Sequence, residues 1–329
     1  MFERNSTRRE FLKYGNLSIL FVLSSCSNNS QNVTVAIQNS LYPDSFRDTI
    51  PNAWLQKNLN FININPDKNN KIISASDYVV LNDGWINKIN FTEFREINEF
   101  SFFEKMNKRS REYLNTFQEK QRNKLFPIGI VPYAIVIKNN KELIKSARKS
   151  WNFLLSRKLK EKIIFPESPR IFFSIAERIN STDSLAKLKR QAMVFDDKNA
   201  LNWLINSDAC VAIVPYSTCS KYLKVDPRLS IVFPNQGVPL MWHFLLIRSN
   251  LKSRLLVEWI ELLESKSNVN KLSSQGWYLP FKNNYFESKH NSMVSGPSQE
   301  CWNNSWSFST LTKLQKTNFE EYWNNSLTP

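Results

Sequence analysis

Glycine and histidine are scarce in this sequence, whose 329 residues include six glycines and two histidines. So few glycines exclude collagen-like and glycine-rich low-complexity structure. Two histidines leave little room for an all-histidine metal site. The four cysteines are widely scattered and form no Cys-x-x-Cys pair, so neither a structural zinc site nor a thioredoxin-type redox site is visible. We therefore expect no metal and no cofactor.

Long apolar runs are also missing outside the N-terminus. A helix that spans a membrane needs about 20 apolar residues, and no run there reaches this length. Aromatic residues, in contrast, make up 13% of the chain, and 44 lysines and arginines against 29 acidic residues give a net charge of +15. The aromatic content supplies a large core and argues against disorder. The length fits one large or two medium domains.

Residues 1–25 have the features of an export signal. Arg8 and Arg9 precede Phe-Leu-Lys, a pattern that resembles a twin-arginine signal. The stretch from Lys13 to Cys26 spans roughly 18 Å as a helix, too short for the roughly 30 Å hydrocarbon core. Leu-Ser-Ser-Cys resembles a bacterial lipobox, which would make Cys26 the lipidated first residue of the mature chain, followed by a polar tether up to residue 32. The alternative is an uncleaved signal anchor or a chance basic and apolar start.

These motifs predict a periplasmic protein that is held on a membrane by the lipid on Cys26. Three cysteines then remain, at positions 210, 219 and 301, so at most one disulfide can form within the chain. Because twin-arginine substrates generally fold before export, in a reducing compartment, we expect buried free thiols.

Apolar and β-branched runs alternate with helical patterns along most of the mature chain, which predicts an α/β protein with a largely parallel sheet. The expected strands are residues 33–37, 59–64, 77–81, 127–138, 162–165, 209–214, 230–233 and 240–247. The expected helices are residues 46–58, 141–155, 168–179, 184–193 and 252–263, with Ser181-Thr182-Asp183 as the cap of the fourth.

The order of these segments resembles the solute-binding proteins of the bacterial spermidine and putrescine transport family. The segments that carry the resemblance are residues 76–86, 130–133, 151–155, 165–170, 211–216 and 233–242, with Tyr322-Trp323 similar to the closing helix of cyanobacterial members. The family has the two-lobed type II periplasmic-binding-protein fold, in which two crossing strands join the lobes. The resemblance places the first crossing at residues 130–133, and the second, with its Pro-x-x-Gly loop, at 211–216 and 233–242.

The resemblance also divides the mature chain into lobes. It implies a first lobe over residues 33–133, a second over 134–241, a return to the first over 242–300, and a C-terminal helical segment, 301–329, packed on the second. Hinge motion about the crossings would close such a protein on its ligand.

Ligands of open α/β sheets bind beyond the carboxyl ends of the strands. The resemblance and this rule together give five candidate ligand-binding residues: Asp83, Trp85, Tyr133, Glu167 and Trp242. Four of them have a plainer alternative. The two tryptophans can be core residues, Glu167 an exposed carboxylate, and Asp83 the partner of its own turn.

A polyamine needs carboxylates and aromatic faces around its ammonium groups. In the family, an aspartate of the cleft follows the tryptophan of the second crossing by two residues, but this chain has Phe244 there. An ammonium buried without its carboxylate loses several kcal/mol of compensation. Polyamine is therefore the expectation from the family, weakened by Phe244 and by the basic net charge.

The resemblance implies a non-catalytic, solute-binding lipoprotein of an ABC importer, with a small polar ligand and with permease and ATPase subunits as partners. The basic charge suits an anionic membrane surface, and no nucleic-acid partner is expected of an exported chain. The alternative is a lipid-anchored envelope interaction protein whose cleft is filled by its own aromatic residues. An exported hydrolase is disfavoured. His243 could serve as its base, but the sequence contains no Gly-x-Ser-x-Gly elbow that would present a serine nucleophile. Arg170 either pairs locally or binds an anion.

Overall fold

The strands in the part of the chain that the structure describes form one mixed sheet. The computed structural model describes residues 34–38, 46, 60–64, 69–97, 100–222, 225–248, 254–282, 296–308, 317, 321 and 323. The sheet has nine strands in the order β2-β1-β3-β9-β4-β7-β5-β6, and β8 pairs with β4 beside this path. The strands are β1 (Thr34–Gln38), β2 (Asn60–Ile64), β3 (Tyr78–Asn82), β4 (Phe126–Lys138), β5 (Ile163–Phe165), β6 (Ala192–Phe195), β7 (Val211–Pro215), β8 (Leu229–Val232) and β9 (Leu240–Ile247).

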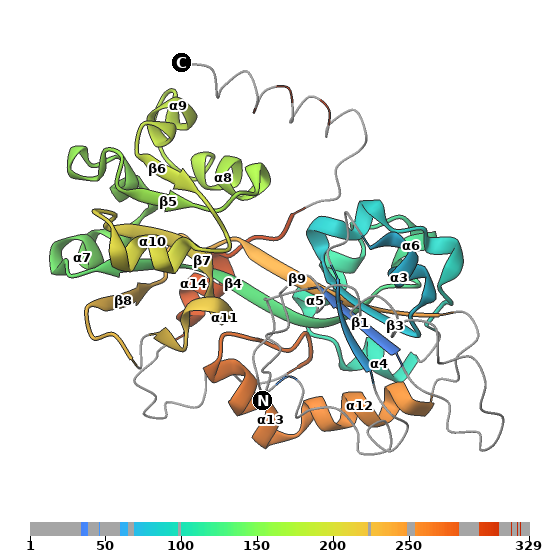
Figure 1. Cartoon of the computed structure of the whole chain (residues 1–329). Helices are drawn as coiled ribbons and strands as arrows, with labels where there is room; N and C mark the ends of the chain where they lie inside the picture. The colour runs from blue at the N-terminus through green and yellow to red at the C-terminus, as the bar shows by residue number, and fades with distance from the viewer. Residues whose placement is uncertain are drawn as a thin grey trace, which may run out of the picture.

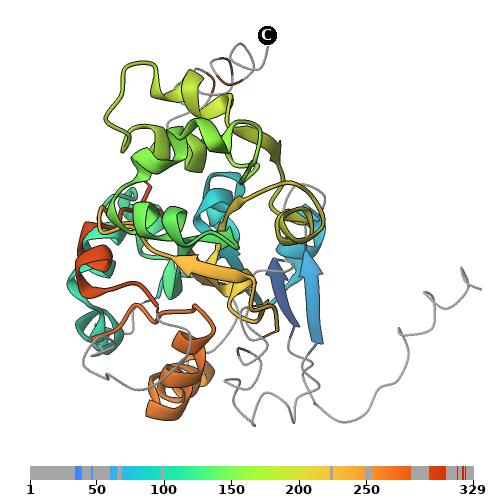
Figure 2. The same ribbon diagram turned by 90° about the vertical axis from the view of Figure 1, so that its left-hand side faces the viewer.

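Helices cover both halves of this sheet (Figures 1 and 2). The α-helices are α3 (Asn70–Ala75), α4 (Phe100–Lys105), α5 (Lys108–Leu114), α6 (Glu119–Arg122), α7 (Lys141–Lys149), α8 (Pro169–Ala176), α9 (Ser184–Lys189), α10 (Ala200–Asn206), α11 (Tyr216–Cys219), α12 (Arg254–Glu264), α13 (Lys266–Ser274) and α14 (Gln299–Asn304). The 3-10 helices are η2 (Asp83–Lys88), η3 (Phe91–Glu93), η4 (Trp151–Leu155) and η5 (Arg157–Leu159).

The direction of the strands changes across the sheet. The end strands run parallel, β1 with β2 and β3, and β5 with β6 and β7. The central strands run antiparallel, β9 with β3 and β4, and β4 with β7 and β8. The expectation of a largely parallel sheet is therefore wrong at its centre. The reason is that the chain leaves one half of the sheet along β4 and returns along β9 in the opposite direction.

Strand β4 divides the sheet into two lobes. Its residues 126–132 pair with β9 in lobe 1, and from Tyr133 onward it pairs with β7 and β8 in lobe 2. Every residue of β4 except Lys138 is buried, so the crossing strand belongs to the core of both lobes. Figure 1 shows lobe 1 with β1, β3 and α3 on one side of this strand, and lobe 2 with β5, β6 and α8 on the other.

The chain returns to lobe 1 through residues 233–239, which lead into β9. Gly237 of this loop has a φ of +87°, and a Cβ there would lie 2.2 Å from the backbone of Asn304, so no larger residue fits. Of the segments compared with the second crossing, 233–242 makes it, whereas β7 stays in lobe 2 beside β4.

A third segment of chain lies at the junction. The backbone N–H of Leu240 donates to the carbonyl of Trp306 at 2.8 Å, and the N–H of Trp306 donates to the carbonyl of Val238 at 3.1 Å. The Arg109 guanidinium of α5 donates to the carbonyls of Trp302 and Ser305, both at 2.6 Å. Residues 302–306 are therefore attached to both the return crossing and lobe 1.

The expected helix over residues 141–155 is broken at Ser150, whose backbone is extended with a φ of −165° and a ψ of 152°. The Ser150 hydroxyl caps the 3-10 helix that follows, and Trp151 is held by the crossing loop. The Trp151 N–H donates to Gln236 Oε1 at 2.8 Å, and its indole donates to the carbonyl of Gly237 at 2.9 Å. These long-range hydrogen bonds end α7 at Lys149, although the periodicity of the sequence predicts a helix that continues to residue 155.

The expected helix over residues 184–193 was also wrong in its second half. Helix α9 ends at Lys189, and Met193 lies in β6, which pairs with β5. The expected cap is absent as well, because Asp183 has a φ of 55° and makes no side-chain capping bond.

Several expectations fall on residues that the structure does not describe: the export signal, Cys26, the tether, the helix over 46–58 apart from Phe46, and Tyr322. None of the helices in the described part of the chain has the length and apolar character that crossing a bilayer requires. Cys210, Cys219 and Cys301 are free thiols, as expected, with Cys219 and Cys301 buried.

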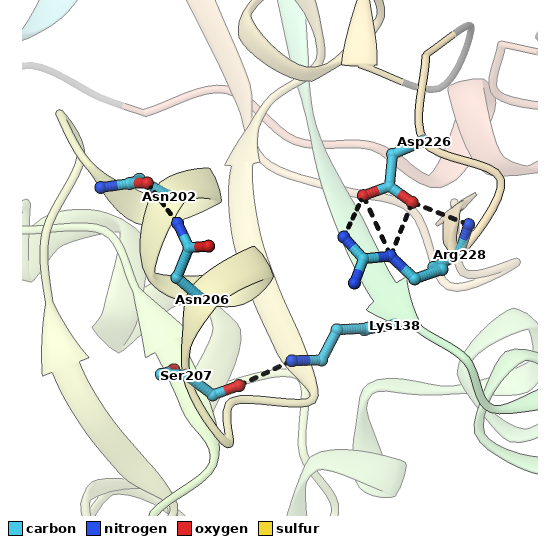
Figure 3. Close-up of polar contacts among 6 residues, drawn as sticks. All are labelled: Lys138, Asn202, Asn206, Ser207, Asp226 and Arg228. Atoms are coloured by element: carbon cyan, nitrogen blue, oxygen red, sulfur yellow. Dashed lines mark hydrogen bonds and ion pairs between the residues drawn. The ribbon is translucent and has the colours of Figure 1, made fainter.

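Polar contacts complete the edge of lobe 2 where β4 ends (Figure 3). The ammonium of Lys138 donates to the carbonyl of Ser207 at 2.7 Å, and Arg228 forms an ion pair with Asp226 at 2.7 Å. This edge lies at the end of β4 remote from the junction, so these contacts serve the lobe and not the site described next.

Candidate functional site at the junction of the lobes

Asp83 follows β3 as the first residue of η2. Asn82 caps this turn, since its side-chain oxygen accepts from the N–H of Gly84 at 3.0 Å. The Asp83 carboxylate is thus left for other partners. Its Oδ2 accepts from the Tyr113 hydroxyl at 3.0 Å and lies 3.3 Å from the Arg170 guanidinium. The Asp83 side chain is only 1% exposed, and this ion pair joins lobe 1 to lobe 2 in the interior.

Arg170 lies at the start of α8, just after β5. Its guanidinium carbon lies 4.3 Å from the centre of the Phe308 ring, and 22% of its side chain is exposed. Burial by itself would lower the pKa of Arg170, but the Asp83 carboxylate and the Tyr113 and Tyr133 hydroxyls outweigh that effect and raise it. Arg170 is therefore a permanent cation that is held between a carboxylate of lobe 1 and an aromatic ring of the C-terminal segment.

Tyr113 of α5 connects Asp83 to the aromatic residues of β9. Its ring stacks on Trp242 with centroids 4.6 Å apart, and it lies 6.2 Å from the Phe244 ring. Burial, followed by the Asp83 carboxylate, raises the pKa of Tyr113 well above its usual value, so that the hydroxyl stays a neutral donor. Trp242 is fully buried behind this ring, and its indole N–H donates to Ser307 Oγ at 2.7 Å.

Tyr133 stands where β4 changes partners between the lobes. Its side chain is buried, with 5% of the residue exposed, and within the described residues its hydroxyl has no hydrogen-bond partner. Burial and the Asp197 carboxylate raise the pKa of Tyr133, the Arg170 charge opposes them, and Asp83 adds a smaller increase. The hydroxyl is therefore within range of charges from both lobes.

Two carboxylates lie near each other on the lobe 2 side, each two residues beyond the paired strand ends Phe165 and Phe195. Glu167 is exposed in the loop between β5 and α8, and Asp197 follows β6. Asp197 keeps contact with solvent, yet the protein around its carboxylate partly desolvates it. This desolvation and the negative charge of Glu167 raise the pKa of Asp197 to about 6, against the effect of the Glu167 N–H.

Trp85, the remaining predicted residue, is half-buried in η2. Its ring lies 4.5 Å from the ammonium of Lys88, a residue of the same 3-10 helix. A cation of the chain therefore already lies over this aromatic face.

The predicted residues are thus only partly gathered. Asp83 pairs with Arg170, whose charge also acts on Tyr133, Glu167 lies near Asp197, and Trp242 lies behind Tyr113. Sequence reasoning missed three contributors: Tyr113, Asp197 and Phe308. Asp197 follows the carboxyl end of a parallel strand, so finding β6 would have revealed it. Tyr113 and Phe308 gave no signal, because their contacts are long-range.

The described residues contain no group of three or more histidine, cysteine, aspartate or glutamate side chains that could hold a metal ion. What the junction offers instead is a mixture of fixed charges and neutral phenols, which suits the recognition of a polar solute by hydrogen bonds and ion pairs.

The sequence matches no protein-family model and no curated protein. Solved structures nevertheless share its fold. A spermidine/putrescine ABC transporter substrate-binding protein, PotD, from Streptococcus pneumoniae has a TM-score of 0.65 at 12% identity, over 90% of this chain and 98% of the other. The TpPotD lipoprotein of Treponema pallidum has a TM-score of 0.64 at 12% identity, over 90% and 99% of the two chains. A periplasmic thiamin binding protein has a TM-score of 0.60 at 11% identity, over 93% and 100%.

These likenesses establish the fold class. The chain has the two-lobed type II periplasmic-binding-protein fold, as expected from its sequence.

Proposed function

We propose that this chain is the solute-binding component of an ABC importer, which holds a small polar solute between its lobes and presents it to a permease and its ATPase. The observation that carries the proposal is the meeting of Asp83, after β3, with Arg170, after β5, at 3.3 Å across the junction. Charged groups at the carboxyl ends of strands are where an open α/β sheet places its ligands. A binding role without catalysis is in keeping with this set of residues.

The local charge of the junction favours a cationic solute, although the chain as a whole is basic. Among the described residues of the site, the carboxylates of Asp83, Glu167 and Asp197 accompany the guanidinium of Arg170. A polyamine is one such solute, and the solved structures of this fold include proteins named for spermidine and putrescine and for thiamin. The class of solute is therefore the question to put to the purified protein.

Thermal unfolding in the presence of single solutes tests the proposal. The panel contains spermidine, putrescine, thiamin, amino acids, small anions and ferric chelates. A solute at 100 times its dissociation constant adds about 2.7 kcal/mol to the free energy of unfolding. We expect a shift with a cationic member. A variant that combines Glu167→Gln with Asp197→Asn should lose it, and failure of every solute to shift the wild type would refute the proposal.

We propose further that the chain is exported and tethered in the periplasm by a lipid on Cys26. The twin-arginine pattern and the lipobox support this, and a neighbour of the same fold is itself named a lipoprotein. Mass spectrometry of the mature N-terminus tests it. Acylated Cys26 at that position is the expected result, and Cys26→Ser should release the protein from membranes.

A second candidate is an envelope interaction protein whose cleft no longer binds a solute. The contacts among the side chains of the site favour this candidate. Arg170 forms an ion pair with Asp83 and lies over the Phe308 ring, and Tyr113 stacks on Trp242. In that case no solute of the panel shifts the unfolding transition, and capture of cross-linked envelope partners replaces solute binding as the productive assay.

A further inference from the structure

The guanidinium of Arg170 occupies the kind of place that a cationic solute would occupy. Its partners are a buried carboxylate, Asp83 at 3.3 Å, and an aromatic face, Phe308 at 4.3 Å. A carboxylate together with an aromatic ring is also the set that recognises an ammonium group. One cation position at the junction is therefore already filled by the protein.

The filled position is closed as well as occupied. The second oxygen of Asp83, Oδ1, is buried and has no hydrogen-bond partner among the described residues, while Oδ2 takes both Tyr113 and Arg170. A solute reaching Asp83 would have to displace Arg170, and that would leave a guanidinium without its carboxylate in a mostly buried place.

Glu167 and Asp197 define a second position beside it. Each lies two residues beyond the paired strand ends Phe165 and Phe195, where the Asp196 N–H donates to the carbonyl of Phe165 at 3.0 Å. Within the described part of the chain neither carboxylate forms an ion pair. Tyr133, a residue that is only 5% exposed and whose hydroxyl has no partner among the described residues, feels the charges of Asp197, Arg170 and Asp83. It can donate to a carboxylate or accept from an ammonium that is bound next to it.

This inference deepens the proposed function and rests on it. We infer that Arg170 acts as a built-in cation that fills one of two cation positions, so that the site takes a solute with a single positive group and discriminates against diamines and polyamines. A second ammonium on the solute would have to approach the fixed charge of Arg170, and like charges at short range repel. Arg170 is in this sense a specificity-determining residue.

Two amines of equal length provide the test. 1-Aminobutane and 1,4-diaminobutane differ by one ammonium group, and their affinities for the purified protein are measured by isothermal titration. For the wild type we expect the monoamine to bind about tenfold more tightly or better. Arg170→Met removes the charge but keeps much of the bulk, and should reverse this preference. Arg170→Lys keeps the charge and should keep the preference.

A second variant keeps the test decisive if Arg170→Met does not fold. Glu167→Gln removes a carboxylate from the open position and should weaken the monoamine about tenfold. Glu177→Gln, at the end of α8 and exposed on the same lobe, is its control and should change nothing.

The outcomes separate the two claims. If the wild type prefers the diamine, or if Arg170→Met leaves the preference unchanged, the built-in cation is refuted while solute binding stands. If neither amine nor any other solute of the panel binds, the proposed function itself fails and this inference fails with it.

Discussion

The Tyr113 hydroxyl donates to Asp83 at 3.0 Å while the Tyr113 ring lies stacked on Trp242. One side chain thus satisfies a buried carboxylate and covers a buried indole. Tyr113→Phe keeps the stack but removes the donor, which leaves Asp83 with Arg170 as its only partner among the described residues. We expect the free energy of unfolding to fall by about 1–3 kcal/mol, as measured by urea denaturation.

The matched control for this prediction is Tyr222→Phe, because the Tyr222 residue is 37% exposed. Its loss of a hydroxyl should change stability by less than about 0.5 kcal/mol. Equal effects of the two substitutions would show that the Tyr113 hydrogen bond does not stabilise the junction.

The charged carboxylate of Asp197 should lower the free energy of unfolding at neutral pH. Its pKa is raised from 3.8 to about 6, so the folded chain holds the proton more tightly than the unfolded chain. Stability from this group is therefore present at low pH and is lost as the pH rises through about 6. Asp197→Asn should stabilise the protein at pH 7 and flatten this part of the pH profile.

The neighbouring Asp196 provides a control of opposite sign. Partial burial raises the pKa of Asp196, but hydrogen bonds from the Asn199 N–H at 2.7 Å and the Trp203 indole at 3.0 Å outweigh this effect and lower it. Its charged form is thus favoured by folding, and Asp196→Asn should destabilise the protein at pH 7. Changes of the same sign in both variants, followed by urea denaturation, would contradict the assignment.

His243 should cause a loss of stability in mild acid. It lies fully buried in β9 with its ring 4.4 Å from that of Trp277, and burial lowers its pKa from 6.5 to about 3. The unfolded chain therefore takes up a proton near pH 6.5, which the folded chain refuses until about pH 3. Between pH 7 and pH 5 the protein should lose about 2 kcal/mol from this residue.

His243→Phe tests this, because it keeps an aromatic ring against Trp277 but does not titrate. Urea denaturation at the two pH values should show a smaller loss in the variant than in the wild type. An equal loss would assign the acid sensitivity to other groups.

Substitution of Gly237 in the return crossing should destabilise the protein. Its positive φ costs an L-residue about 1–2 kcal/mol, and a methyl group would also collide with the backbone of Asn304. Gly237→Ala should therefore lower the melting temperature clearly. At Gly84 the nearest atom to an added methyl is Asn82 Oδ1 at 3.1 Å, so Gly84→Ala is the milder control. Comparable melting temperatures for the two variants would show that the loop relaxes.

The sequence predicted the elements of the fold better than their arrangement. The apolar run over Leu240–Ile247 predicted β9 to the residue, because a strand buried on both faces has a pattern of its own. Its insertion between β3 and β4 depends on pairing between distant residues, and no local pattern encodes it. Strand β6 was missed because its short apolar run follows directly on a helical pattern, and with it Asp197 was missed.

The candidate site shows the same division. Asp83 and Tyr133 could be proposed from the sequence because they follow a strand or lie at a crossing. The pairing of Asp83 with Arg170 could not be found, because it depends on how α8 of one lobe meets η2 of the other. For the same reason the sequence suggested a ligand contact for Trp242, whereas Tyr113 from α5 covers its ring.

The position of β9 between β3 and β4 also sets the order in which the chain can fold during synthesis. Strands β5 to β8 lie together in the chain, and with the second half of β4 they can assemble as soon as the ribosome has released them. The sheet of lobe 1 lacks its middle strand until residue 247 has emerged, so β3 and the first half of β4 must wait for a partner made much later. We expect nascent chains truncated before β9 to protect lobe 2 against protease and to leave lobe 1 open to cleavage.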